Sequence, residues 1–257
     1  MTRNQILQCD VLDGLRELPD NSVDLVITSP PYNKAGINGR CSRFHASNWE
    51  QSINYNGDID VDCMPEPGYE DWQVEVLNQL YRVLKQDGSV FYNHKNRIVR
   101  RQGYIISPWQ WIVRTPFLVR QVITWDRRSS PSVNNQRYLP VTEEIFWLTK
   151  SATPRFRRPA DAPQKTEVWS IPYEQNSEHP APFPIEIPDA IIPCVAQGER
   201  ILVLDPFIGS GTTAVSAMKH DCDFLGFELF KEYVDMAKER MGEVPGWTCK
   251  WDKWYRA

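Results

Sequence analysis

The chain has 257 residues, of which 41% are hydrophobic, so it can bury one sizeable core and form a single α/β domain over residues 1–257. No apolar run approaches the roughly 18 residues of a membrane span, no signal pattern is visible, and six scattered cysteines lack a Cys-x-x-Cys pair, which predicts a cytoplasmic protein with reduced thiols and no membrane partner. The net charge of −4 argues against a nucleic-acid-binding surface spread evenly along the chain.

The first elements in chain order are a strand and a short helix. Residues 6–9 form an apolar-rich strand that ends at Asp10, and a helix is expected from Val11 to Leu15. Asp10 stands where a helix N-cap is expected, because its side chain can accept a hydrogen bond from a free backbone N–H of the first turn.

The next predicted strand, residues 23–27, is short and rich in β-branched residues, as in parallel strands covered on both faces. Residues 28–33, Thr-Ser-Pro-Pro-Tyr-Asn, should therefore lie at the carboxyl edge of an open sheet, where α/β folds bind ligands. Two successive prolines fix φ and remove two N–H donors, so this segment presents carbonyls in a stiff frame. The Ser29 hydroxyl and the Pro30 carbonyl could hold the hydrogens of an amine, and Tyr32 offers a ring face to a base. An ordinary Pro-Pro turn is the alternative.

A polar, turn-rich stretch over residues 34–67 is too long for an idle connection, and we expect it to be a mobile loop over the substrate. Apolar residues at helical spacing then predict a helix over 70–85, after which Asp87-Gly88 turns the chain into a strand at 89–92. Further along we expect a helix at 107–114 and strands at 117–124 and 144–150.

The middle of the chain concentrates positive charge. Between Lys95 and Lys165 there are fourteen Lys and Arg against four Asp and Glu, with Trp109, Trp111 and Trp125 among the basic groups. Basic groups supply sequence-independent affinity for phosphates, and residues 126–140 add polar groups that can reach base edges. Each residue taken singly is better explained as solvated surface or core, but the aggregate favours nucleic acid as the partner.

Near the end of the chain, an apolar strand at 201–204 runs into residues 205–213, Asp-Pro-Phe-Ile-Gly-Ser-Gly-Thr-Thr, and then into a helix. The glycines permit tight turns and leave no Cβ between the main chain and a ligand, while free N–H groups of the helix start would face that ligand. The following strand, 224–227, ends at Glu228, where a carboxylate commonly accepts hydrogen bonds from ribose hydroxyls. A tight turn with no ligand remains the alternative, and phosphate binding is disfavoured because the P-loop lysine is missing.

Strands that alternate with helices predict a Rossmann-like, doubly wound and mostly parallel sheet with helices on both faces. Within such a fold, the two edge segments resemble the signature motifs of the amino-methylating DNA methyltransferases. Residues 205–213 match that family's S-adenosylmethionine loop, Asp-Pro-Phe-x-Gly-Ser-Gly-Thr-Thr, at every position, and residues 29–32 match its catalytic Ser/Asp-Pro-Pro-Tyr motif. Because the catalytic segment comes first, the chain resembles the permuted beta group, whose fold is that of class I methyltransferases.

The resemblance implies S-adenosylmethionine as cofactor, methyl transfer to the exocyclic amine of a flipped base in double-stranded DNA, and a role in restriction-modification. The catalytic residues it implies are Ser29, Pro30, Pro31 and Tyr32. The cofactor-binding residues it implies are Asp10 near the adenine, Glu228 on the ribose, and Thr28, Asp205, Pro206, Phe207, Gly209, Ser210, Gly211, Thr212 and Thr213. For Asp10 the helix N-cap is an equal alternative. No metal is expected, because His179 has no second ligand at helical or turn spacing.

DNA contacts are expected from residues 34–67 and from target-recognition elements within 126–168. The candidate residues are Lys34, Arg40, Arg43, Arg97, Arg127, Arg128 and Arg137. In this family the stretch before the final cofactor segment usually carries target recognition, but here only about 18 residues separate Lys150 from Trp169. Specificity must then be shared among loops or come from a second subunit, so a homodimer is one expected partner and a cognate restriction endonuclease another.

The motifs determine the reaction more closely than they determine which base receives the methyl group. Ser29 at the first motif position favours cytosine N4, whereas Asn33 after the motif is frequent among adenine N6 enzymes, and we favour cytosine. Two rival functions stay open: amino-methylation of RNA or of a free base by the same residues, and a catalytically silent DNA-binding protein with this fold. The intact motifs at 29–32 and 205–213 argue against the silent protein.

Overall fold

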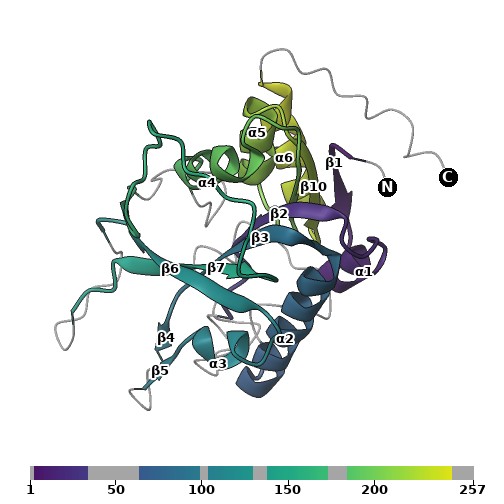
Figure 1. Ribbon diagram of the computed structural model, residues 1–257. Helices are drawn as coiled ribbons and strands as arrows, with labels where there is room; N and C mark the ends of the chain where they lie inside the picture. The colour runs from purple at the N-terminus through teal and green to yellow at the C-terminus, as the bar shows by residue number, and fades with distance from the viewer. Residues whose placement is uncertain (1–2, 34–63, 99–103, 130–137, 173–183, 245–257) are drawn as a thin grey trace.

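The computed structural model describes residues 3–33, 64–98, 104–129, 138–172 and 184–244, and its centre is one eight-stranded sheet (Figure 1). In spatial order the strands are β1 (Gln5–Gln8), β10 (Asp223–Glu228), β9 (Leu202–Asp205), β2 (Val23–Thr28), β3 (Leu84–His94), β7 (Thr142–Thr149), β6 (Leu118–Asp126) and β8 (Val168–Ser170). The strands from β1 to β3 are parallel, β7 is antiparallel to both neighbours, and β8 is parallel to β6. The mostly parallel, doubly wound sheet predicted from the sequence is confirmed.

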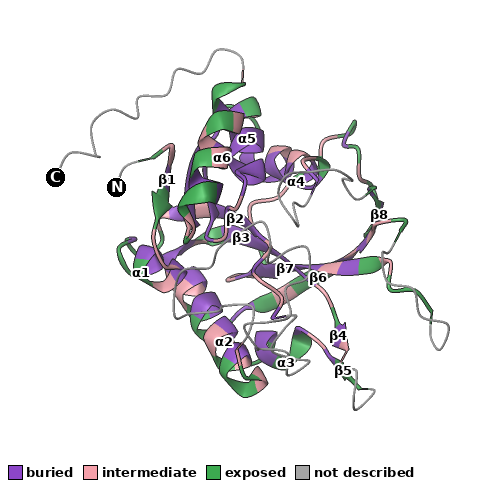
Figure 2. Ribbon diagram, turned by 180° about the vertical axis from the view of Figure 1, so that it is seen from behind, coloured by how far each residue is buried: buried purple, intermediate pink, exposed green. Residues whose placement is uncertain are grey.

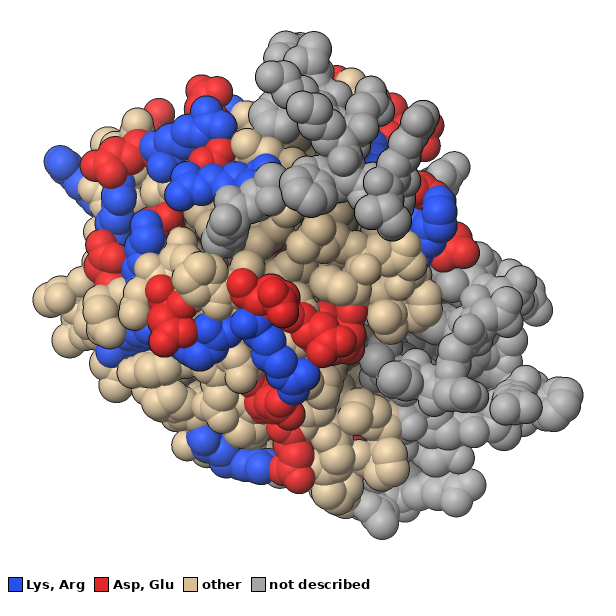
Figure 3. Space-filling model, turned by 90° about the vertical axis from the view of Figure 1, so that its right-hand side faces the viewer, with Lys and Arg blue, Asp and Glu red and all other residues tan. Residues whose placement is uncertain are grey.

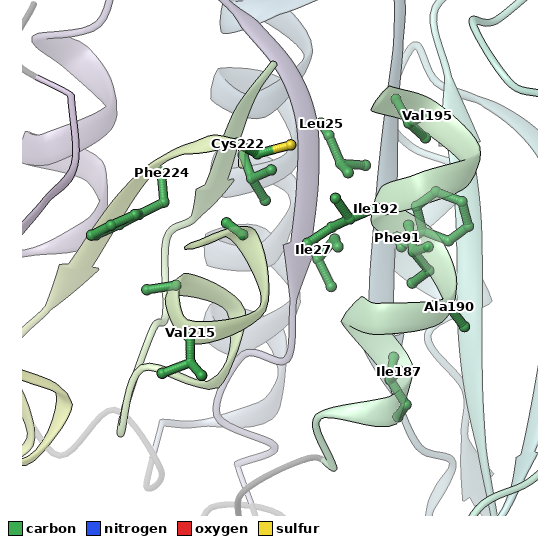
Figure 4. Close-up of a cluster of buried hydrophobic side chains, with 14 of the residues drawn as sticks. Leu25, Ile27, Phe91, Ile187, Ala190, Ile192, Val195, Val215, Cys222 and Phe224 are labelled. Carbon is green, nitrogen blue, oxygen red and sulfur yellow. The ribbon is translucent and has the colours of Figure 1, made fainter. Parts of the chain in front are cut away.

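Helices cover both faces of this sheet, because successive side chains of a strand point to opposite faces. Leu25 and Ile27 of β2 belong to a buried cluster shared with α4 (Glu186–Ala196), α5 (Thr212–Lys219) and α6 (Lys231–Gly242), part of which is drawn in Figure 4. Val26, between them, belongs to the cluster shared with α1 (Val11–Arg16), α2 (Glu66–Val83) and α3 (Trp109–Ile112). Figure 2 shows the central strands buried between these two layers. Both layers therefore hold β2 rigidly just before the catalytic segment.

Several elements differ from the predictions. Neither α4 nor β8 was predicted, nor was the small antiparallel pair of β4 (Arg97–Ile98) and β5 (Ile105–Ile106). Strand β3 begins at Leu84, ahead of the Asp87-Gly88 pair, and its pairing with β2 shifts register between Val23 and Leu25. The turn expected at Asp87-Gly88 therefore does not separate helix α2 from a strand. These two residues lie inside β3, close to the register shift in its pairing with β2.

The predicted substrate loop over 34–67 is described only at its end. There α2 already begins at Glu66, so the last residues assigned to the loop belong to a helix. Residues 34–63 lie outside the described part of the chain. Among the described residues, no helix is both long enough and apolar enough to cross a membrane.

Candidate active site

The two signature segments meet at the carboxyl edge of the sheet because their strands are neighbours. In the β2–β9 pair, Leu25 lies opposite Val203 and Val26 opposite Leu204, so both chains leave the sheet side by side. The Thr28 hydroxyl then donates a 2.9 Å hydrogen bond to Asp205 Oδ1. A direct bond thus joins the end of the strand before Ser29 to the start of the glycine loop.

Asp205 organises the glycine loop from within. Its Oδ1 also accepts a 3.1 Å hydrogen bond from the Phe207 amide, and its Oδ2 accepts one of 2.7 Å from the Thr213 hydroxyl. Burial raises the pKa of Asp205 to about 6, although the hydrogen bonds from Thr213 and Thr28 oppose that rise. These bonds hold both oxygens of the carboxylate to the protein, which makes Asp205 an anchor of the loop.

The loop backbone adopts the conformations for which its glycines are needed. Gly209 has φ +50° and Gly211 φ +84°, and a Cβ on Gly211 would lie 2.9 Å from the Cβ of Ala237 in α6. From the same helix, Arg240 donates hydrogen bonds to the Ser210 carbonyl at 2.9 Å and to the Ser210 hydroxyl at 2.7 Å. The loop is thus held closely against α6, and Arg240 is a contributor that the sequence motifs did not indicate.

Glu228 ends β10 and closes the loop from the other side. Its Oε2 accepts a 3.1 Å hydrogen bond from the Gly209 amide, and its Oε1 accepts one of 2.9 Å from the Phe230 amide. Burial raises the pKa of Glu228 to about 7, against the effect of these backbone bonds. A carboxylate that is costly to ionise in the fold can gain from further hydrogen-bond donors.

Asp10 follows β1, the strand beside β10, and so lies at the same edge of the sheet. Its Oδ1 accepts a 2.8 Å hydrogen bond from the Leu12 amide and caps α1. The helix N-cap considered for Asp10 is therefore formed. Its proposed position near a cofactor adenine stays a prediction.

A hydrogen-bonded cluster surrounds the hydroxyl of Tyr32. The Ser29 and Tyr32 hydroxyls are 2.8 Å apart, and Tyr32 donates to Glu143 Oε2 at 2.9 Å. Asn93 Nδ2, at the end of β3, lies 2.8 Å from the Tyr32 hydroxyl, 3.0 Å from Glu143 Oε2 and 3.3 Å from Ser29 Oγ. The Tyr32 ring centroid is 4.5 Å from that of His94. Asn93 and Glu143 were not predicted, because nothing in their local sequence marks them.

Glu143 is paired with Arg127 beneath this cluster. Their closest charged atoms are 3.5 Å apart, and the side chains are only 8% and 12% exposed, respectively. Arg127 also donates a 2.7 Å hydrogen bond to the Pro140 carbonyl. Its guanidinium thus points into the site, which differs from the DNA phosphate contact predicted for it.

The Pro-Pro segment is held from behind by α2. The Tyr69 hydroxyl donates a 2.6 Å hydrogen bond to the Pro31 carbonyl and lies 2.8 Å from His94 Nε2. Because the single Tyr69 proton is used on Pro31, His94 donates from Nε2 and accepts the Lys95 amide at Nδ1. Burial and the nearby Arg97 charge lower the pKa of His94 well below its ordinary value, which keeps this imidazole neutral.

The other predicted DNA contacts are distributed differently from expectation. Arg97 is buried, pairs with Glu66 and lies over the rings of Tyr69 and Trp111, so its location does not offer it to a phosphate. Arg128 is exposed and donates to the Ser170 hydroxyl and carbonyl, each at 2.9 Å. Four candidates for DNA contact lie outside the described residues: Lys34, Arg40, Arg43 and Arg137. His179, considered as a metal ligand, lies outside them too.

Surface charge is mixed on one side of the molecule. The face in Figure 3, which is the right-hand side of Figure 1, interleaves Lys and Arg with Asp and Glu. That face therefore does not provide a uniformly basic surface for a phosphate backbone.

Among the described residues, no group of three or more His, Cys, Asp and Glu side chains is placed to hold a metal ion.

A glycine loop and a polar Pro-Pro segment, joined at the carboxyl edge of a permuted α/β sheet, define the class of amino-methylating enzymes with a class I methyltransferase fold. The family model described as DNA methylase, of N6 and N4 methyltransferases, matches residues 23–239. The chain belongs to this family of S-adenosylmethionine-dependent DNA methyltransferases that act on cytosine N4 or adenine N6.

Individual relatives agree with this assignment. Type II methyltransferase M.BglII of Bacillus subtilis is 30% identical over an alignment that covers 94% of this chain and 70% of that protein. The cytosine-N4-specific PvuII DNA methyltransferase has a similar structure, with a TM-score of 0.74, 22% identity, and coverage of 93% of this chain and 86% of that one. The structure of TTHA0409 of Thermus thermophilus in complex with S-adenosyl-L-methionine is also similar. Its TM-score is 0.67 and its identity 24%, with coverage of 95% of this chain and 96% of that one.

Proposed function

We propose that this protein transfers a methyl group from S-adenosylmethionine to the exocyclic amine of a cytosine flipped out of double-stranded DNA. The observation that carries the proposal is the 2.9 Å hydrogen bond between Thr28 and Asp205, since it fixes the catalytic segment directly beside the cofactor loop. A group bound on the loop and an amine held by Ser29 would then be neighbours, which is the proximity that a transfer reaction requires.

The chain offers a donor and acceptor set that suits the cofactor. The left-handed conformation of Gly209 leaves main chain without a Cβ at the half-buried surface of the loop, while that of Gly211 lets the loop pack closely against α6. Glu228 uses one lone pair on each oxygen for Gly209 and Phe230, and a carboxylate has about four such positions, so ribose hydroxyls can still donate to it. When bound, the cofactor supplies an electrophilic methyl group on a sulfonium.

The remaining residues act on the target amine. The lone pair of an exocyclic amine is delocalised into its ring, so the nitrogen is a poor nucleophile until its hydrogens are held by acceptors. Ser29 Oγ and the Pro30 carbonyl are those acceptors, and the buried Pro30 ring together with the Tyr69 bond to Pro31 keeps them in place. Tyr32 supplies a half-buried ring beside which the flipped base would stack.

Cytosine is favoured over adenine by Ser29 at the first position of the motif. It is also the base named for the structurally similar PvuII enzyme. The experiment that tests the proposal is methylation of duplex DNA in vitro, followed by digestion to nucleosides and mass analysis. N4-methylcytosine is the expected product, whereas N6-methyladenine would correct the base and leave the reaction class intact.

The same assay separates the remaining alternatives. Equal or faster labelling of RNA in competition with duplex DNA would contradict the proposed substrate, and no transfer to any nucleic acid by the folded protein would contradict the reaction. The homodimer, the cognate endonuclease and the cytoplasmic location stay predictions from the sequence.

A further inference from the structure

The amine that accepts a methyl group must also lose a proton. The nitrogen lone pair forms the new N–C bond while the carbon–sulfur bond breaks and its electrons stay on sulfur, so the positive charge passes to nitrogen. Ser29 can receive an N–H proton only if it passes its own proton onward, because a serine hydroxyl is a weak base. The next acceptor in the structure is the Tyr32 oxygen, 2.8 Å from Ser29 Oγ.

The direction of each hydrogen bond follows from Asn93. Its Nδ2 can only donate, and its two shortest contacts are with the Tyr32 oxygen and Glu143 Oε2, while Ser29 Oγ lies farther away at 3.3 Å. An ionised Glu143 can only accept, so the Tyr32 proton is directed to Glu143 through their 2.9 Å bond. The Ser29 hydroxyl must then donate to Tyr32, which leaves Ser29 Oγ able to accept a hydrogen bond from the amine.

Burial and the neighbouring Glu143 raise the pKa of the Tyr32 phenol well above its ordinary value. Tyr32 therefore remains protonated before the reaction. It can accept a proton from Ser29 only as it gives its own proton to Glu143. At the far end, the Arg127 guanidinium lies 3.5 Å from Glu143 Oε1 and compensates the buried negative charge.

We propose that Glu143 is the terminal proton acceptor of a relay that runs from the target amine through Ser29 and Tyr32. The proton of the amine moves to Ser29 Oγ, that of Ser29 to the Tyr32 oxygen, and that of Tyr32 to the Glu143 carboxylate. The charge balances, because one positive charge lost from the sulfonium cancels the one negative charge lost from Glu143. This inference rests on the proposed methyl transfer, and Glu143 acts in it as a positioning and relay residue that does not touch the base.

The test uses the full chain with variants that change one link each. Glu143→Gln keeps the size and an acceptor oxygen but cannot take a proton, and Tyr32→Phe keeps the ring but removes the hydroxyl. In single turnover, each should lower the methyl-transfer rate by about 100-fold, the lower range for a lost general base. Cofactor and DNA affinities should stay within about threefold of wild type. The double variant should be no slower than the slower single variant, because both changes interrupt one chain.

The matched control is Glu144→Gln, which removes the same charge one residue away on β7, where the side chain points to the opposite face of the sheet. It should transfer methyl groups at a rate within about twofold of wild type. A second readout needs neither cofactor nor DNA: the ¹³Cζ NMR signal of Tyr32, identified by its loss in Tyr32→Phe, should shift in Glu143→Gln and stay in place in Glu144→Gln.

Wild-type rates in Glu143→Gln or in Tyr32→Phe would overturn the relay, as would an unchanged Tyr32 signal in Glu143→Gln. Failure of the proposed function looks different, because the wild-type protein itself would then transfer no methyl group to DNA.

Discussion

The Tyr69 hydroxyl lies 2.6 Å from the Pro31 carbonyl and so ties helix α2 to the catalytic segment. Pro31 follows shortly after the buried end of β2, and the Tyr69 side chain is itself fully buried. The rigidity of the segment that holds the amine therefore depends on a residue that never touches the substrate.

Tyr69→Phe is expected to lower the free energy of unfolding by about 1–3 kcal/mol, because it leaves the Pro31 carbonyl and the donors on His94 and Gln73 without their partner in a buried place. The methyl-transfer rate should fall while cofactor affinity is kept. Denaturant titration and single-turnover kinetics measure the two effects. Tyr81→Phe, on the same helix, is the control, and equal stability losses in both variants would contradict the special role of Tyr69.

Glu228→Gln should weaken S-adenosylmethionine binding and make its affinity less dependent on pH. The pKa of Glu228 is raised to about 7, and ribose donors favour the ionised form, so wild-type affinity should rise with pH up to about 7 and level off above it. Titration calorimetry at about pH 5.5 and about pH 8.5 gives, for each protein, the ratio of its S-adenosylmethionine affinities at the two pH values. The contributions of other titrating groups are the same in both proteins and cancel when the two ratios are compared. Identical ratios in wild type and variant would remove Glu228 from the ribose.

Gly211→Ala and Gly198→Ala separate backbone strain from steric overlap in the cofactor loop. Both glycines have left-handed backbones, at φ +84° and +83°, so each substitution should cost about 1–2 kcal/mol from conformation. Only at Gly211 would the new Cβ approach Ala237, at 2.9 Å, whereas nothing lies within 4 Å at Gly198. Denaturant titration should therefore show a larger loss for Gly211→Ala, together with weaker cofactor binding. Equal losses would mean that α6 moves away easily.

Arg127→Ala and Arg128→Ala should fail in different ways. Arg128 is exposed at the catalytic edge, so its loss should reduce the slope of log affinity against log salt by about 0.9 for every DNA sequence alike, if it contacts one phosphate. Arg127 faces Glu143, so its loss should slow methyl transfer and leave the slope unchanged. Arg120→Ala, at the other end of β6, is the control and should change neither the salt slope nor the methyl-transfer rate. A wild-type slope in Arg128→Ala would show that this residue is solvated surface.

The parts of the fold that the sequence predicted are those set by local patterns. Strands β2, β9 and β10 and helix α5 were found because short β-branched runs and a glycine turn mark them. Helix α4 was missed because Pro188 and Pro193 argue against a helix, although Pro188 lies in the first turn and the helix ends soon after Pro193. The buried packing of Ile191 and Ile192 against the sheet outweighs the loss of a hydrogen bond at Pro193.

The sequence predicted the two motifs of the candidate site together with Asp10, Thr28 and Glu228, but not the residues around Tyr32. Asn93 and Glu143 reach Tyr32 because β3 and β7 pair beside β2. The sequence around either residue does not indicate that order of strands. For Arg97 the error came from counting charge without burial, since Glu66 and two aromatic rings supply a place for this cation inside the protein.

The antiparallel course of β7 has a consequence for engineering. Asp126 at the end of β6 pairs with Thr142 at the start of β7, so the connection between them begins and ends at the catalytic edge. A hairpin connection of this kind can be lengthened or exchanged at little cost in stability. Grafts that test whether this connection carries the target recognition predicted for it should begin after Arg128 and end before Pro140, since the Pro140 carbonyl holds Arg127 and Arg127 pairs with Glu143.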